Sequence, residues 1–111
     1  MAEVEKKAVK VSKRFDVDIA LIFEYGEETF GYTAAKIFIG EIYNYVWNLD
    51  SMYLNYPECR HLPTKSHIYR NVILGSYLII YRITPKQIEV LNVINSRMSI
   101  TKIRGARSIK L

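Results

Sequence analysis

The sequence predicts an α+β domain in which an N-terminal strand and a two-helix hairpin pack on an antiparallel sheet of three to four strands. Two observations support this fold class. The second half holds three apolar runs rich in valine, isoleucine and tyrosine, which favour a half-buried pleated surface: Ile68–Leu74, Tyr77–Ile83 and Ile88–Asn95. The first half instead repeats its apolar residues at helical spacing, and so supplies the layer that such a sheet needs.

The three apolar runs are separated by spacers short enough for hairpins, Gly75-Ser76 and Thr84-Pro85-Lys86, which predicts an antiparallel meander. Neither face of the middle strand is polar throughout, so we expect both to be covered and the last two strands to hold the centre of the sheet. Alternation places Tyr77, Ile79, Tyr81 and Ile83 on one face and Leu78, Ile80 and Arg82 on the other.

The first half opens with alternating residues over Ala8–Ser12, which predict a short strand at a sheet edge. Ser12 is a suitable N-cap for a helix that stops at Gly31. Asp16 and Asp18 fall in the opening turn of this helix, where negative charge suits the helix dipole.

A second helix is predicted from about Thr33 to Leu49, and the short break before it makes the two helices an antiparallel hairpin. Asn55-Tyr56-Pro57 closes the helical half, and Glu58–Ser66 is predicted to be a loop. The stripe that predicts the second helix is Ala35, Phe38, Ile39, Ile42, Val46 and Leu49.

Length and composition indicate one ordinary globular domain: 111 residues, 50% hydrophobic and 24% charged. The single cysteine, Cys59, cannot form an internal disulfide, which favours a reducing compartment. No apolar run approaches the roughly 20 residues of a membrane helix, and Met1–Lys6 is charged and expected to fray. We therefore expect a cytoplasmic protein without a membrane partner.

Charge is distributed unevenly along the chain, whose formal net charge is +5. Residues 1–58 carry a net −4, whereas residues 59–111 carry a net +9. This asymmetry predicts a basic surface on the sheet and the C-terminal tail, suited to an acidic partner or a phosphate backbone. A generally soluble basic protein is the alternative, because charge alone does not identify a partner.

Several motifs occur along residues 8–97: Val9-Lys10-Val11-Ser12, Asp18, Tyr25, Asn55-Tyr56-Pro57, Tyr69-Arg70, Tyr77–Ile83 and Ile88–Ile94. In this order they resemble the RelE/ParE superfamily of bacterial type II toxin–antitoxin toxins. The resemblance implies a single toxin domain over residues 1–97, followed by a basic C-terminal tail, 98–111, whose secondary structure the sequence leaves open.

The resemblance implies a toxin that is neutralised by a small antitoxin encoded beside it. RelE-like members cleave mRNA on the ribosome, and ParE-like members poison DNA gyrase. RNA cleavage without a metal needs groups that activate the 2′-hydroxyl, stabilise the phosphorane and protonate the leaving oxygen. Arg70 and Arg97 match two basic positions of the nuclease, but Leu78 and Asn95 stand where arginine and histidine are usual, and no tyrosine follows Tyr81. The sequence therefore favours the ParE-like function, with a RelE-like nuclease or a non-toxic basic binding module as alternatives.

The candidate site residues are all basic, and the sequence predicts neither a cofactor nor a metal, since Cys59 and His61 are too few for a closed zinc site. Arg70 and Arg97 would be catalytic if the chain is a nuclease. Expected partners are an antitoxin, in a hetero-oligomer, and either gyrase or the ribosome with its mRNA. The residues expected to bind target or partner are Arg70, Arg82, Arg97, Lys102, Arg104 and Arg107.

Overall fold

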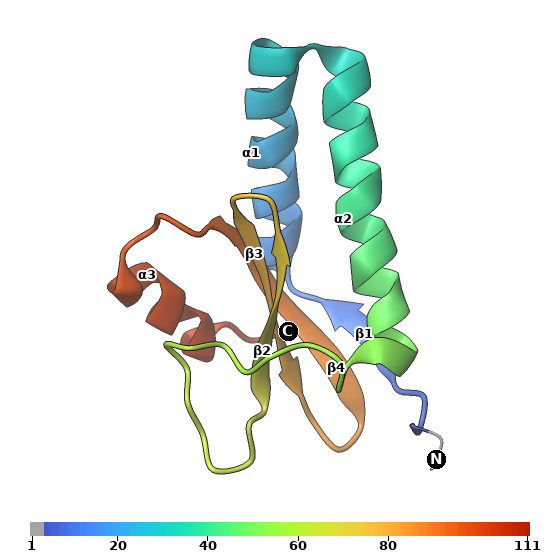
Figure 1. Cartoon of the computed structure of the whole chain (residues 1–111), viewed down its shortest axis with the longest axis vertical. Helices are drawn as coiled ribbons and strands as arrows, with labels where there is room; N and C mark the ends of the chain where they lie inside the picture. Colours follow the sequence, from blue (N-terminus) through green and yellow to red (C-terminus); the bar gives the residue numbers. More distant parts are fainter. Residues whose placement is uncertain (1–3) are drawn as a thin grey trace.

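The computed structural model describes residues 4–111 and confirms the predicted α+β fold class (Figure 1). The predicted fraying of Met1–Lys6 falls in part on residues 1–3, which lie outside the described residues. No helix of the described part is both long enough and apolar enough to pass through a membrane. The elements in chain order are β1 (Ala8–Val11), α1 (Lys13–Phe30), α2 (Tyr32–Met52), β2 (Tyr69–Leu74), β3 (Tyr77–Ile83), β4 (Gln87–Asn95), α3 (Ile100–Arg104) and the 3₁₀ helix η1 (Gly105–Ser108).

The strands form one four-stranded sheet in the order β1-β4-β3-β2. The predicted meander is confirmed, because β2, β3 and β4 pair antiparallel and β3 and β4 occupy the centre. Gly75 adopts φ +59° in the turn between β2 and β3, a conformation that glycine reaches without strain. Strand β1 lies at the predicted edge, but it runs parallel to β4, so this pair departs from a purely antiparallel sheet.

The helical hairpin covers one face of the sheet through its lower half, and its upper half projects beyond the strands (Figure 1). Ser12 caps α1 as predicted, because its hydroxyl accepts a hydrogen bond from the Phe15 amide at 2.9 Å. Gly31, at φ +91°, separates the two helices. The core between hairpin and sheet centres on Phe15, Ile42, Leu49, Ile79, Tyr81 and Val90, all fully buried.

The opposite face of the sheet is also covered, as the middle strand predicts. The tail, whose structure the sequence left open, forms α3 and η1 and packs Ile103 and Ala106 against this face. Leu62 from the loop after α2 completes the cover. This second core includes Cys59, Tyr69, Ile80, Leu91 and Ile94.

Candidate partner-binding groove

A groove runs between the helical hairpin, the sheet and the C-terminal segment. One part, of about 650 Å³, lies between the hairpin and the β2–β3 turn. The other part, of about 560 Å³, lies between α1, the end of β4 and the segment that holds α3 and η1. Ile22, Tyr25, Tyr77 and Asn95 line both parts, so they form one continuous surface, called here the groove.

The groove exists because β4 extends beyond its neighbour β1. The pairing of β1 with β4 ends at Val11 and Val90, so within residues 4–111 no strand pairs with Leu91–Asn95 on that side. Side chains bind part of this free edge instead. The Ser12 hydroxyl donates to the Leu91 carbonyl, and the Asp18 carboxylate accepts from the Val93 amide at 3.0 Å.

Asp18 corrects one expectation from the sequence. Only Asp16 lies in the first turn of α1, whereas Asp18 is buried and binds the strand edge. Arg14 pairs with Asp18 through its Nε at 3.0 Å. Burial raises the pKa of Asp18 above its ordinary value, against the opposing effects of the Val93 hydrogen bond and of Arg14.

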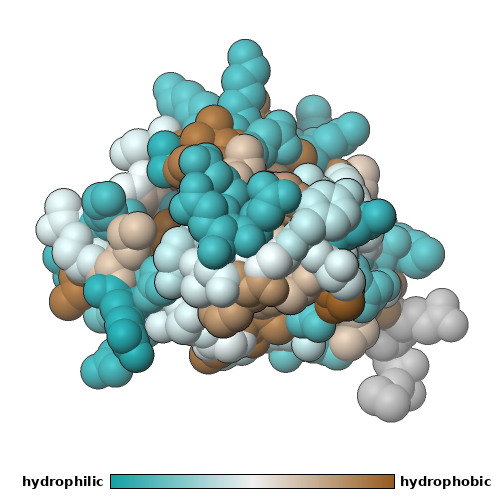
Figure 2. All heavy atoms as spheres, turned by 90° about the horizontal axis from the view of Figure 1, so that it is seen from above, coloured by the Kyte–Doolittle hydropathy of each residue, from teal (hydrophilic) through white to brown (hydrophobic). Residues whose placement is uncertain are grey.

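Exposed apolar side chains line the hairpin side of the groove. Leu21 and Tyr25 lie one helical turn apart on α1, are 55% and 58% exposed, and Val17 extends the same stripe by a further turn. Met98 lines the groove from the opposite wall. Seen from the hairpin end, brown hydrophobic atoms are interspersed with teal hydrophilic ones (Figure 2). Exposed apolar side chains that follow one helix face beside a groove are typical of a surface that binds a partner.

Basic side chains stand at the rim of this apolar strip. Arg14, Arg97 and Lys102 all line the groove and all are exposed. The Arg97 amide donates to Asn95 Oδ1 at 2.9 Å, which fixes the chain as it leaves β4. Arg104 is exposed on α3 but does not line the groove. Of the six predicted binding residues, the structure brings only Arg97 and Lys102 together here.

Arg70 lies elsewhere, at the start of β2, and binds three backbone carbonyls. Its guanidinium donates to the carbonyls of Tyr56 at 2.9 Å, Leu54 at 3.2 Å and His67 at 3.2 Å. These contacts tie the loop after α2 to the sheet. Cross-strand pairing places Arg70 on the same face as Tyr81.

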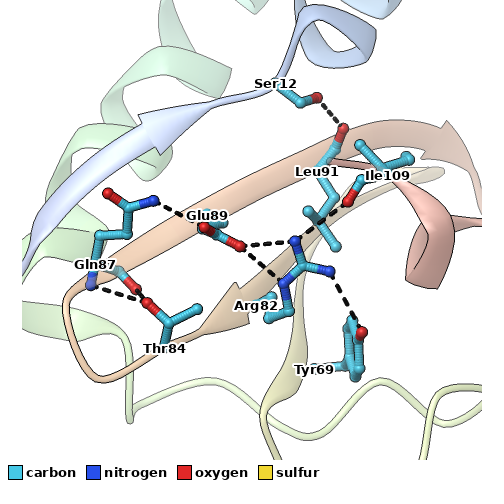
Figure 3. A network of polar contacts seen from close by, with 8 residues as sticks. All are labelled: Ser12, Tyr69, Arg82, Thr84, Gln87, Glu89, Leu91 and Ile109. Atoms are coloured by element: carbon cyan, nitrogen blue, oxygen red, sulfur yellow. Dashed lines mark hydrogen bonds and ion pairs between the residues drawn. The ribbon is translucent and has the colours of Figure 1, made fainter. Parts of the chain in front are cut away.

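Arg82 lies on the opposite face, within a polar network (Figure 3). Its guanidinium binds Glu89 through two nitrogens, at 2.8 and 2.7 Å, and also donates to the Ile109 carbonyl at 3.2 Å. Burial acts to raise the pKa of Glu89, but hydrogen bonds from Gln87 and Arg82 outweigh it and lower that pKa. The network therefore anchors the C-terminal segment to the sheet.

Arg107 belongs to the same region as Arg82, because both guanidinium groups lie 5.8 Å from the centre of the Tyr69 ring. Five of the six predicted cations thus divide into three places: Arg70 beside the hairpin, Arg82 and Arg107 on the tail-covered face, and Arg97 with Lys102 at the groove. The sixth, Arg104, is exposed on α3. Sequence reasoning missed the groove itself, although the spacing of Val17, Leu21 and Tyr25 is visible in the sequence.

Comparisons with known proteins agree with this fold. The family described as the ParE toxin of the type II toxin–antitoxin system parDE matches residues 9–100, so the chain belongs to this family. Among solved structures, the chain is similar to the chromosomal ParDE toxin–antitoxin system from P. aeruginosa, with a TM-score of 0.68 at 16% identity, over 82% of this chain and 97% of that one. A search of curated proteins gives no significant match. Family membership confirms the RelE/ParE resemblance and implies an antitoxin partner.

Proposed function

We propose that this ParE-family chain inhibits bacterial growth by acting on DNA gyrase, and not by cleaving mRNA. The observation that carries the proposal is the separation of the two cations that a nuclease site would need. Arg70 lies four residues along β2 from Leu74, which is about 13 Å at the usual rise of a strand. Leu74 pairs with Tyr77, which pairs with Asn95, and Arg97 lies beyond Asn95. Arg70 and Arg97 therefore lie at opposite ends of the sheet.

The remaining nuclease positions offer no replacement chemistry. Leu78 packs against the core on the tail-covered face, and the Asn95 amide cannot exchange a proton near neutral pH. Loss of a single well-placed transition-state stabiliser typically slows catalysis by about a hundredfold or more. A site that lacks both a converging cation and a proton donor is expected to be far slower still.

The groove is the proposed docking surface for the antitoxin, in a hetero-oligomer. Its apolar side chains Leu21 and Tyr25, with Val17 one turn further along the same face of α1, fit the apolar side of an amphipathic segment. Arg14, Arg97 and Lys102 at its rim favour carboxylates on the flanks of that segment. The net +9 of residues 59–111 would steer an acidic chain toward this surface. With gyrase as the target, the site of action is the cytoplasm.

The proposal is tested with purified protein, purified gyrase, ATP and relaxed plasmid DNA. We expect the toxin to block supercoiling and to convert plasmid to linear DNA after protein denaturation. Arg97→Ala is expected to weaken this effect, because Arg97 joins the sheet to the basic C-terminal segment. Lys65→Ala is the matched control, since it removes one exposed positive charge from a loop outside the groove. Normal supercoiling at saturating toxin would contradict the proposal.

Antitoxin docking is tested separately by growth rescue. Expression of the toxin alone is expected to slow growth, and co-expression of the adjacent antitoxin gene to restore it. Leu21→Glu should remain toxic but escape rescue, whereas Ile37→Glu, an exposed aliphatic on α2 outside the groove, should be rescued normally. Normal growth at confirmed expression of the wild type would instead support a non-toxic binding module.

A further inference from the structure

A second charged surface lies over the second core, on the side of the sheet that the C-terminal segment covers. Ile103 and Ala106 are buried in that core together with Cys59 and Leu62 of the loop after α2. The C-terminal segment and this loop therefore lie side by side (Figure 1). The exposed cations that these two segments carry next to residues of the core are called here the basic face: Arg60, Arg104, Arg107 and Lys110.

The backbone of the C-terminal segment directs two of these arginines to solvent. Helix α3 passes directly into η1, and residues three apart lie on the same side of such a turn. Ile103 and Ala106 face the core, so Arg104 and Arg107, which follow them, share an outward side. The Arg107 guanidinium lies over the Tyr69 ring, 5.8 Å from its centre. This contact orients the guanidinium without using its N–H donors, which stay available for hydrogen bonds.

The carboxylates in this half of the chain are already paired. Residues 58–111 contain two, Glu58 and Glu89. Glu58 binds His67 at 2.9 Å, and Glu89 binds Arg82 at 2.7 Å. Within residues 4–111, no ion pair involves a cation of the basic face. The positive charge of this surface is therefore free to meet anions of another molecule.

The residue types of the basic face fit phosphate groups. Three of its four cations are arginines, whose planar guanidinium presents parallel N–H donors to a phosphate. A row of exposed cations matches the regular negative charge of a nucleic-acid backbone. The groove differs, because exposed apolar side chains accompany its cations, as expected for a surface that binds an amphipathic peptide.

We propose that the basic face binds nucleic acid, and that it holds the sugar–phosphate backbone of duplex DNA without reading the sequence. The choice of DNA over RNA rests on the proposed action on gyrase, whose substrate is DNA. The four cations do not line the groove, so this surface is distinct from the proposed antitoxin site. In this arrangement the toxin contacts the DNA that gyrase holds.

The experiment measures the salt dependence of DNA binding by the purified toxin alone. A fluorescent duplex of about 20 base pairs and arbitrary sequence is titrated with toxin at about 50 to 200 mM NaCl, and anisotropy reports binding. Each neutralised phosphate contributes about −0.9 to the slope of log affinity against log salt, so four contacts predict a slope of about −3.6. Affinity should then fall about 150-fold across this range of salt. A wild-type toxin that does not bind the duplex at the lowest salt would overturn the inference.

The double variant Arg104→Ala/Arg107→Ala should bind more weakly, with a slope less steep by about 1.8, because two phosphate contacts are lost. Lys13→Ala/Lys36→Ala is the matched control, since it removes the same net charge from exposed positions on α1 and α2. The control should keep the wild-type slope. An unchanged slope in the arginine variant, or an equal change in the control, overturns the inference. If the arginine variant does not fold, Arg104→Gln alone should reduce the slope by about 0.9 and is held to the same criterion.

Duplex RNA and poly-glutamate are titrated in parallel to identify the class of partner. Tighter binding of poly-glutamate than of DNA would overturn the assignment to nucleic acid, and tighter binding of duplex RNA would overturn the choice of DNA. Failure of the gyrase proposal is recognised separately, because supercoiling would then stay normal while the duplex is still bound. Blocked supercoiling by a toxin that does not bind the duplex would reject the role of the basic face alone.

Discussion

Arg70→Ala is predicted to destabilise the fold substantially, because Arg70 joins the loop after α2 to the sheet. The substitution removes one partly buried hydrogen bond, to Tyr56, and two exposed ones, to Leu54 and His67. A hydrogen bond from a charged donor contributes roughly 1.5–3 kcal/mol when it is shielded from water, and clearly less when it is exposed. We therefore expect a loss of about 2–3 kcal/mol in the free energy of unfolding.

For a domain of this size, about 1 kcal/mol shifts the melting temperature by about 4 °C, so Arg70→Ala should melt roughly 8–12 °C below wild type. Circular dichroism during thermal unfolding measures the shift, and urea titration gives the free energy. Arg97→Ala is the control, since its exposed side chain should change stability by less than about 0.5 kcal/mol. An Arg70→Ala protein that melts like the wild type but is no longer toxic would contradict the structural role of Arg70 and place it in a binding site.

Two further predictions concern buried polar groups. Burial raises the pKa of Asp18, so the folded protein holds this proton more tightly than the unfolded chain does. Ionisation of Asp18 therefore destabilises the fold: the loss is absent below the ordinary pKa of 3.8 and is complete above the raised pKa. Asp18→Asn should therefore gain stability relative to wild type as pH rises from about 4 to 7, and a difference that is constant across urea titrations in that range would contradict this. Tyr81→Phe should lose about 1–2 kcal/mol, because the Tyr81 hydroxyl donates to the buried Tyr53 carbonyl at 2.6 Å, and an unchanged urea midpoint would show that this bond contributes nothing.

The sequence predicts those parts of the fold that depend on local periodicity and turn residues. Periodicity reflects which face a segment buries. It predicts the strand Tyr77–Ile83 from its alternation and the second helix from the spacing of Ile42, Val46 and Leu49, and both elements are confirmed. The cap at Ser12 and the break at Gly31 are likewise local features, and both are present.

The features that the sequence did not predict depend on contacts between segments that are distant in the chain. Asp18 is buried because β1 ends before β4 does, and nothing in the residues around Asp18 reveals where a strand more than 70 positions away lies exposed. The register shift between Ile80 and Tyr81 changes the alternation along β4, so the position of Asn92 could not be derived from a strict period of two. Helix α3 is only 5 residues long, too short for helical periodicity to predict it.

The cellular target of the toxin can be measured in growing cells that express the wild-type chain. Gyrase covalently attached to DNA is quantified after rapid lysis, and mRNA ends are mapped in the same samples. We predict that trapped gyrase–DNA complexes rise above the level of a vector control while mRNA stays intact, and that co-expressed antitoxin abolishes the rise. Codon-positioned mRNA cleavage without trapped gyrase, lost in Arg70→Ala at a temperature where that variant is folded, would contradict the proposed action on gyrase and identify a ribosome-dependent nuclease.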